Sequence, residues 1–141
     1  MYKYAINVEL DDNDSYLITC PDFPEVVTFS EVKDGDDGIV HHATNAINEA
    51  IASKIDRFEA LPMPSKGDRL IAPDMHLVLK ALLVKLILEE NVNRAELTRR
   101  LKVERTEVER LFKTSTTPSI NKYQKAFKAL NKSLDLSLTN I

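Results

Sequence analysis

The spacing of apolar residues divides the chain into a part with period two and a part with helical periodicity. In the first ten residues, apolar side chains alternate with more polar ones, at Tyr2, Tyr4, Ile6, Val8 and Leu10. Such alternation predicts a half-buried strand. The turn Asp11–Asp14 leads to a second strand, Ser15–Cys20, and the two predict a hairpin. Pro21–Pro24 interrupts the sheet, since proline cannot donate to a strand ladder, and Val26–Val32 is a third strand.

One long helix and a short strand follow. Over residues 38–60 apolar side chains recur at helical spacing, and the two prolines within residues 61–65 end this helix. Asp36 or Asp37 is placed to cap its start. Residues 69–72 predict a fourth strand. The order β-β-β-α-β predicts an α+β domain over residues 1–72, a sheet with one helix packed on a face.

From Pro73 onward the pattern is helical. Leu77–Leu88 is apolar nearly all round, broken by Lys80, Ala81 and Lys85, so we expect it to be buried on several sides. Residues 73–141 would then form a C-terminal domain. Within it, this helix is either a plain core helix or one that also packs across a subunit interface. Residues 119–132 predict a last helix with an outward lysine stripe, at Lys122, Lys125, Lys128 and Lys132. This stripe fits a solvated face better than a phosphate track. Alternating leucines at 134–138 predict a short final strand that could pair with a second copy.

The segment Arg94–Lys113 has the spacing of two short helices joined by a turn. The apolar positions that define the two helices are Leu97, Leu101, Val108, Leu111 and Phe112. Residues 102–104 form a turn of suitable length, and Asn93 caps the first helix, with Glu96 completing a capping box. This pattern is typical of a helix-turn-helix, whose second helix reads base edges in the DNA major groove.

Charge is distributed unequally along the chain. The whole chain has a formal charge of -3, yet residues 1–92 carry -9 and residues 93–141 carry +6. A basic module on an acidic body is the pattern expected when one part binds phosphates. The acidic part is suited to a basic partner.

The candidate DNA-binding residues lie at the start and on the outward face of the second motif helix: Arg105, Thr106, Glu109, Arg110 and Lys113. Arginine can form two hydrogen bonds with guanine, threonine can contact a thymine methyl group, and lysine can hold phosphate. The glutamates either accept from cytosine or pair with the basic residues and lower affinity. The alternative is a solvated helix in an interaction domain that does not bind DNA.

Other chemistry has little support in the sequence. The single cysteine, Cys20, allows no internal disulfide and fits a reducing compartment. With neither a signal-peptide pattern nor a membrane-spanning apolar run, we expect a cytoplasmic protein. His41 and His42 point about 100° apart on a helix, so we expect no metal site and no cofactor.

Several short motifs, in the same order, resemble the HicB-type antitoxins of bacterial toxin–antitoxin pairs, in the helix-turn-helix subgroup. They are YKYAINVEL, TCPDFPEVVTFSE, HHATNAINEAIASKIDRF, LPMPS and AELTRRLKVERTEVERLF. The resemblance covers nearly the whole chain. It implies a partial RNase H-like N-terminal domain that binds and occludes a small basic HicA-type mRNA interferase. It also implies a Cro/repressor-like C-terminal domain that binds the operator of the pair's own operon.

Two positions depart from the family pattern. The loop KDGDDGIVHHA lacks the Glu-Glu pair usual there, and Lys102 stands where the motif turn usually holds glycine. A left-handed conformation at a non-glycine residue costs about 1 kcal/mol, which a turn can tolerate.

A toxin that binds RNA is expected to be basic, so acidic residues of the N-terminal part are candidates for its binding. The candidate toxin-binding residues are Asp22, Glu25, Asp34, Asp36 and Asp37. Their alternative role is to keep the domain soluble. We expect no catalysis, because two-metal hydrolysis needs carboxylates that converge at the centre of a sheet, whereas Glu9 stands near a strand end and the aspartates lie in turns.

The sequence therefore predicts a non-enzymatic antitoxin and autorepressor, a homodimer or tetramer on an inverted-repeat operator. Two other functions stay open. One is a stand-alone helix-turn-helix repressor whose N-terminal domain senses a ligand. The other is a nuclease that depends on Glu9.

Overall fold

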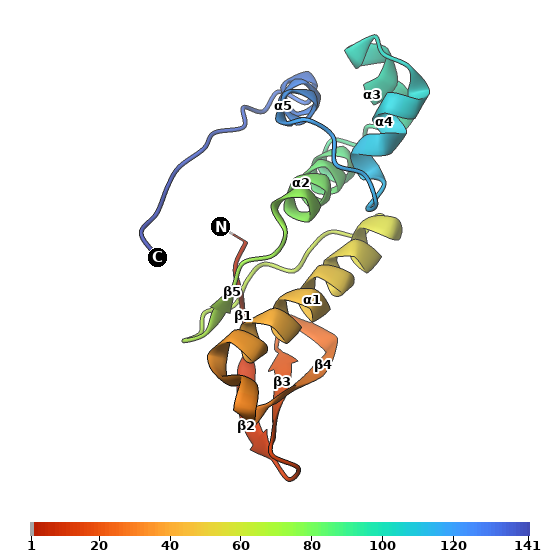
Figure 1. Ribbon diagram of the computed structural model, residues 1–141. Coiled ribbons are helices and arrows are strands. Elements are labelled where there is room, and N and C mark those ends of the chain that lie inside the picture. The colour runs from red at the N-terminus through yellow and green to blue at the C-terminus, as the bar shows by residue number, and fades with distance from the viewer. Residues whose placement is uncertain (1) are drawn as a thin grey trace.

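The strands and the longest helix occupy one end of an elongated molecule, and four shorter helices occupy the other (Figure 1). This computed structural model describes residues 2–141. The elements of the first end are β1 (Tyr4–Ala5), β2 (Asn7–Asp11), β3 (Ser15–Cys20), β4 (Phe23–Glu31), a 3-10 turn (Val32–Asp34), α1 (Gly35–Asp56) and β5 (Leu70–Ile71). Those of the second end are α2 (Met75–Glu89), α3 (Arg94–Leu101), α4 (Arg105–Phe112) and α5 (Ile120–Ala129). The predicted α+β class is confirmed.

The strands form two small antiparallel sheets, one of order β2-β3-β4 and the other of β1 with β5. The predicted first strand is divided at Ile6, whose N–H donates to the carbonyl of Arg69 at 3.0 Å. The predicted interruption at Pro21–Pro24 is wrong in its second half, because β4 already begins at Phe23. Pro24 is tolerated there because the register shifts between Thr19 and Cys20, so that no ladder partner faces it.

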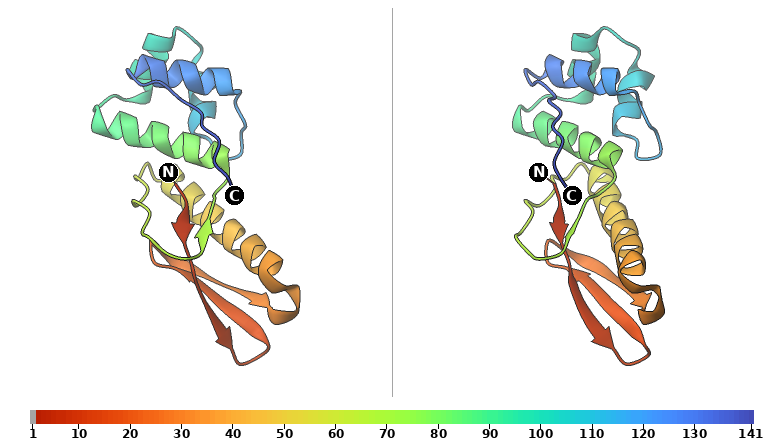
Figure 2. Two further views of the ribbon diagram at one scale, coloured as in Figure 1. Left: turned by 90° about the vertical axis from the view of Figure 1, so that its left-hand side faces the viewer. Right: turned by 60° about the vertical axis from the view of Figure 1, so that its left-hand side comes forward.

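Helix α1 covers one face of the three-stranded sheet (Figure 2). Its buried stripe of Ile39, Ala43, Ile47, Ala50, Ile51 and Ile55 belongs to the same apolar core as Ile18, Cys20, Phe23 and Val26 of the sheet. The helix begins at Gly35, three residues before the predicted start. Asp36 and Asp37 therefore lie in its first turn, where their charge favours the helix dipole, and neither is the capping residue.

At Gly38, α1 leaves no room for a Cβ atom beside β4, and we expect Gly38→Ala to destabilise the protein by about 1–3 kcal/mol. A Cβ atom there would lie 2.5 Å from the Ser30 Oγ and 2.6 Å from the Asp34 Cβ. At an open helical site, Ala in place of Gly would instead stabilise by about 1 kcal/mol. Urea unfolding shows whether the substitution lowers or raises the free energy of unfolding. Asn45→Ala, at an exposed position of the same helix, is the control and should stay within about 0.5 kcal/mol of wild type.

Helix α2 lies at the centre of the helical end. Its side chains Leu79, Leu83, Val84 and Ile87 are buried, as the apolar pattern predicts. Helices α4 and α5 both pack against α2, and α3 packs against α4 and α5. The rings of Phe58 and Phe112 lie 5.3 Å apart and connect the chain after α1 to the end of α4. The strand end and the helical end therefore share a continuous apolar core.

The predicted final strand is wrong for the single chain. Residues 131–141 have no regular secondary structure, and they extend away from α5 (Figure 1). Leu136 is 78% exposed and Leu138 is fully exposed. A strand requires backbone hydrogen bonds from a neighbouring strand, and within residues 2–141 no strand pairs with this segment. Pairing with a second copy stays a prediction.

Candidate functional site

Helices α3 and α4 are joined by the three-residue turn that the sequence predicts. Asn93 caps α3, its side-chain oxygen accepting from the backbone N–H of Glu96 at 2.8 Å. The capping box is incomplete, because the Glu96 carboxylate pairs with Arg99 at 2.6 Å and Arg100 at 3.1 Å instead. Lys102 ends α3 in the left-handed conformation, with φ 54° and ψ 43°, and its N–H donates to the carbonyl of Thr98. The turn therefore keeps its geometry without glycine.

One side of α4 is buried and the opposite side is exposed. Val108, Leu111 and Phe112 face the helical core. At 100° per residue, the side opposite them carries Thr106, Arg110 and Lys113, all of which are exposed. The exposed face thus presents two cations and a hydroxyl to solvent. These are groups that can bind phosphates and base edges.

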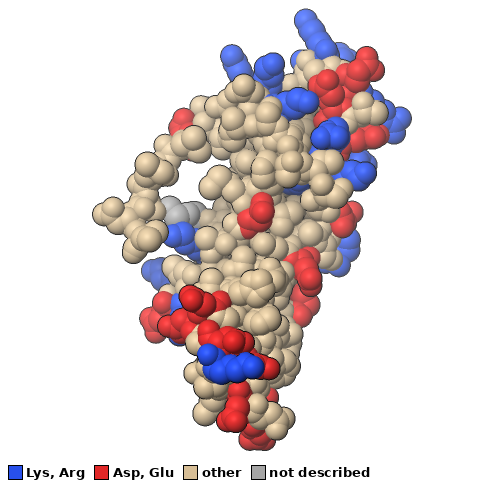
Figure 3. Space-filling model, in the orientation of Figure 1, with Lys and Arg blue, Asp and Glu red and all other residues tan. Residues whose placement is uncertain are grey.

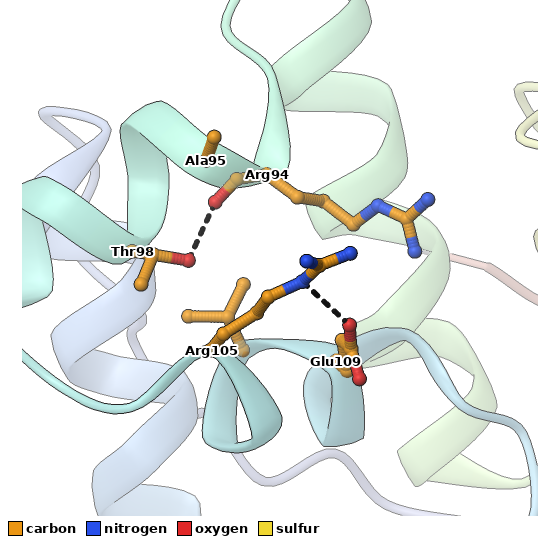
Figure 4. A pocket seen from close by; sticks show the side chains of 6 residues that line it. Arg94, Ala95, Thr98, Arg105 and Glu109 are labelled. Carbon is orange, nitrogen blue, oxygen red and sulfur yellow. Dashed lines mark hydrogen bonds and ion pairs between the residues drawn. The ribbon is translucent and has the colours of Figure 1, made fainter.

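The other two candidate DNA-binding residues point toward α3. Arg105 Nε lies 3.0 Å from Glu109 Oε1 in an i,i+4 ion pair (Figure 4). The pair lines a hollow of about 410 Å³ between the two helices, together with Arg94 and Thr98. The five residues therefore separate into an outward group and an internally paired group. Of the two predicted roles for Glu109, this geometry favours pairing.

We expect Glu109→Gln to raise DNA affinity about threefold, because it weakens the hold on the Arg105 guanidinium and removes a negative charge beside the exposed face of α4. Glu107→Gln is the matched control, since Glu107 lies on the same helix and has no ion pair within the described part of the chain. It should change the affinity less. Fluorescence anisotropy with a labelled duplex measures both; lower affinity in Glu109→Gln would assign Glu109 to base contact instead.

Lys80 is a polar residue at the centre of the helical core that the sequence pattern did not identify as functional. It is fully buried, and its Nζ donates to the carbonyl of Arg110 at 3.2 Å and to Thr116 Oγ1 at 3.3 Å. It also lies 5.5 Å from the centre of the Tyr123 ring. The ammonium group thus ties the last turn of α4 to α2 and to the following loop. The sequence signal for this role is a lysine among apolar residues of α2, but Lys85 of the same helix gives the same signal and is partly exposed.

Burial of Lys80 predicts that the contribution of this residue to the free energy of unfolding rises between pH 8 and pH 10. Desolvation lowers the pKa of Lys80 to about 8, so above that pH the unfolded chain binds the proton more tightly. The Lys80 contribution alone makes unfolding less favourable by roughly 2–3 kcal/mol as pH rises. Burial raises the pKa values of Cys20 and Tyr123, and these groups act in the opposite sense.

The comparison of wild type with Lys80→Met isolates the lysine, because the effects of Cys20 and Tyr123 are common to both proteins. In urea unfolding at pH 8, 9 and 10, the free energy of unfolding of wild type should rise relative to that of Lys80→Met as pH rises. A difference that is constant across these pH values would contradict the assignment.

Charge separates along the length of the molecule. On the face shown in Figure 3, Lys and Arg gather over the helical end, and Asp and Glu gather toward the strand end, with some acidic side chains among the cations. This arrangement agrees with the division of formal charge along the sequence.

The predicted toxin-binding acids do not form a single cluster. Asp22 accepts from the Ser65 N–H at 2.8 Å and hydroxyl at 2.6 Å, and Asp36 pairs with Arg69 at 2.7 Å. Glu25 is exposed near the start of β4. Asp34 and Asp37 lie beyond its other end, and the nine residues of β4 span roughly 30 Å. Two of the five acids thus support the local fold, and the others lie at opposite ends of the sheet.

The described residues contain no group of three or more His, Cys, Asp or Glu side chains placed to hold a metal ion. Glu9 is exposed on β2. Among residues 2–141, no helix has both the length and the apolar character needed to cross a membrane.

Comparison with known families decides the identity of the strand end. A family model described as HicB_like antitoxin of bacterial toxin-antitoxin system matches residues 3–84, more than half of the chain. The chain belongs to this antitoxin family. The match spans β1 to the middle of α2, and therefore includes the sheet and α1 but not α3, α4 or α5.

Curated relatives extend the likeness over the helical end. The chain is 28% identical to Antitoxin HicB of Escherichia coli K12, over 95% of this chain and 97% of that protein. It is 29% identical to Antitoxin HicB of Pseudomonas fluorescens Pf0-1, over 98% of this chain and 94% of that protein. Antitoxin HicB 1 of Photorhabdus laumondii is 23% identical over 96% of this chain and 86% of its own length. The family is one of antitoxins and not of enzymes, and membership implies a toxin as partner.

Proposed function

We propose that this HicB-family antitoxin binds and occludes a cognate HicA-type mRNA interferase and represses its own operon by sequence-specific DNA binding. Residues 1–72 form the partial RNase H-like, toxin-binding domain. Residues 73–141 form the Cro/repressor-like helix-turn-helix domain, which dimerises and binds DNA. The protein would act in the cytoplasm. The observation that carries the proposal is the family match over the acidic strand end, joined to a basic helical end with an α3–turn–α4 unit.

The DNA-binding part of the proposal rests on the exposed face of α4. A recognition helix that docks in the major groove needs a rigid attachment and an outward polar face. Val108, Leu111 and Phe112 anchor α4, and the hydrogen bond from Lys80 to Arg110 fixes its last turn. In a dimer, two such helices would contact half-sites about 34 Å apart, which predicts an inverted-repeat operator.

The toxin-binding part is tested by rescue from growth arrest. The small neighbouring reading frame is induced in a host strain, with and without this chain. We expect arrest without the chain, growth with it, and a complex of the two proteins on co-purification. Arrest that the chain does not relieve, with no complex, would contradict the antitoxin role and leave a repressor of unknown ligand.

A further inference from the structure

The three-stranded sheet has one face that no part of the described chain covers. We propose that this outer face of β2-β3-β4, opposite α1, is the surface that the toxin occupies. The inference rests on the proposed antitoxin function and adds to it the place and chemistry of contact.

The strand register defines the outer face. Glu9, Leu17 and Phe29 are in register across β2, β3 and β4, and so are Asn7, Thr19 and Val27. Residues in register share a face, and the alternate positions Ile18 and Ser30 are buried on the α1 side. Val27 is 58% exposed and Phe29 is 50% exposed. An exposed aromatic next to an exposed valine is the kind of apolar centre that protein interfaces use.

Acidic residues surround this apolar centre. The outward positions also include Glu9, Asp11, Glu25 and Glu31, and β2, β3 and β4 contain no Lys, Arg or His. Lys33, just beyond β4, pairs with Glu31 at 2.9 Å, but both side chains stay exposed. An apolar centre with an anionic rim complements a basic protein surface.

The charge of this face favours a basic partner over a second copy of the chain. In a two-fold dimer built through this face, the same four acids would oppose one another, which is unfavourable. A protein that binds RNA needs a cationic surface for the phosphates. The sheet face would cover that surface, so inhibition would result from direct exclusion of RNA.

The test compares two double variants that introduce the same charge on opposite faces. Val27→Lys/Phe29→Lys places two cations on the outer face. Leu10→Lys/Val40→Lys is the control, since Leu10 and Val40 are 73% and 49% exposed but lie on the α1 side of the sheet and on α1. Each protein is titrated with the purified product of the neighbouring reading frame, and inhibition of cleavage of a labelled RNA is read in parallel. Circular dichroism and light scattering check the fold and the mass.

We expect Val27→Lys/Phe29→Lys to weaken toxin binding about 100-fold and to lose inhibition of RNA cleavage, with an unchanged mass. The control should stay within about threefold of wild type. Equal weakening in both variants, or wild-type affinity in Val27→Lys/Phe29→Lys, would overturn the proposal. So would a fall in mass for that variant alone, which would assign the face to a second copy. If the wild-type chain itself fails to bind, the proposed function fails, and this outcome is distinct from the others.

Discussion

Leu97→Ala is expected to abolish DNA binding while leaving toxin neutralisation intact. Leu97 is fully buried in α3, and it belongs to the apolar core that holds α3, α4 and α5 together. Truncation of a buried leucine to alanine costs about 2–5 kcal/mol, which is a large part of the stability of a small helical unit. The sheet and α1 lie at the other end of the molecule (Figure 2), where α1 packs on the sheet and on α2, and the loss of the Leu97 side chain leaves these contacts in place.

Three measurements on Leu97→Ala test this separation: urea unfolding followed by far-UV circular dichroism, anisotropy with a labelled duplex from upstream of the operon, and growth rescue. Leu10→Ala is the matched control, because Leu10 is 73% exposed and the same truncation there should leave all three unchanged. Loss of rescue together with DNA binding would show that the two ends fold as one unit. Wild-type DNA affinity would show that α3 and α4 do not form the DNA-binding surface.

Arg110→Ala/Lys113→Ala should weaken operator binding by about 10- to 1000-fold, since both cations lie on the outward face of α4. The dependence of affinity on salt concentration should also become shallower, by about one unit of slope for each phosphate contact removed. The structure gives Arg110 a particular role, because its backbone is held by Lys80 while its side chain is free in solvent.

Lys122→Ala/Lys125→Ala is the control for the loss of positive charge. Both lysines are exposed on α5. Anisotropy titrations at several salt concentrations should place this variant within about threefold of wild type. An equal loss of DNA affinity in the two double variants would mean that the lysines of α5 also contact the phosphates. An unchanged affinity in Arg110→Ala/Lys113→Ala would exclude α4 as the recognition helix.

Helices with a regular spacing of buried residues or a clear capping residue were predictable from the sequence. The stripe from Ile39 to Ile55 located α1, and Asn93 located the start of α3. Predictions failed where a tertiary contact decides the outcome. Pro24 lies within a strand only because the register shifts beside it, and the leucines after residue 133 have the alternation of a strand but no partner.

The candidate site shows the same limit. Helical periodicity located the exposed face of α4 and allowed the i,i+4 pair of Arg105 with Glu109. It could not show that this pair lines a hollow with Arg94 and Thr98, because that depends on how α3 lies against α4. Nor could sequence distance show that Asp22 is engaged by Ser65, 43 positions away. The outer sheet face could not be predicted from the sequence. Its apolar residues, Leu17, Val27 and Phe29, alternate along their strands as buried residues do, and only the fold shows which face of the sheet α1 covers.

Toxin binding by this chain can be measured directly in a calorimetric titration of the purified chain with the purified product of the neighbouring reading frame. RNA cleavage is assayed on the same samples. We expect a tight, saturable complex and loss of cleavage in proportion to the fraction bound. Absence of binding heat, with cleavage unaffected at equimolar and excess antitoxin, would contradict it.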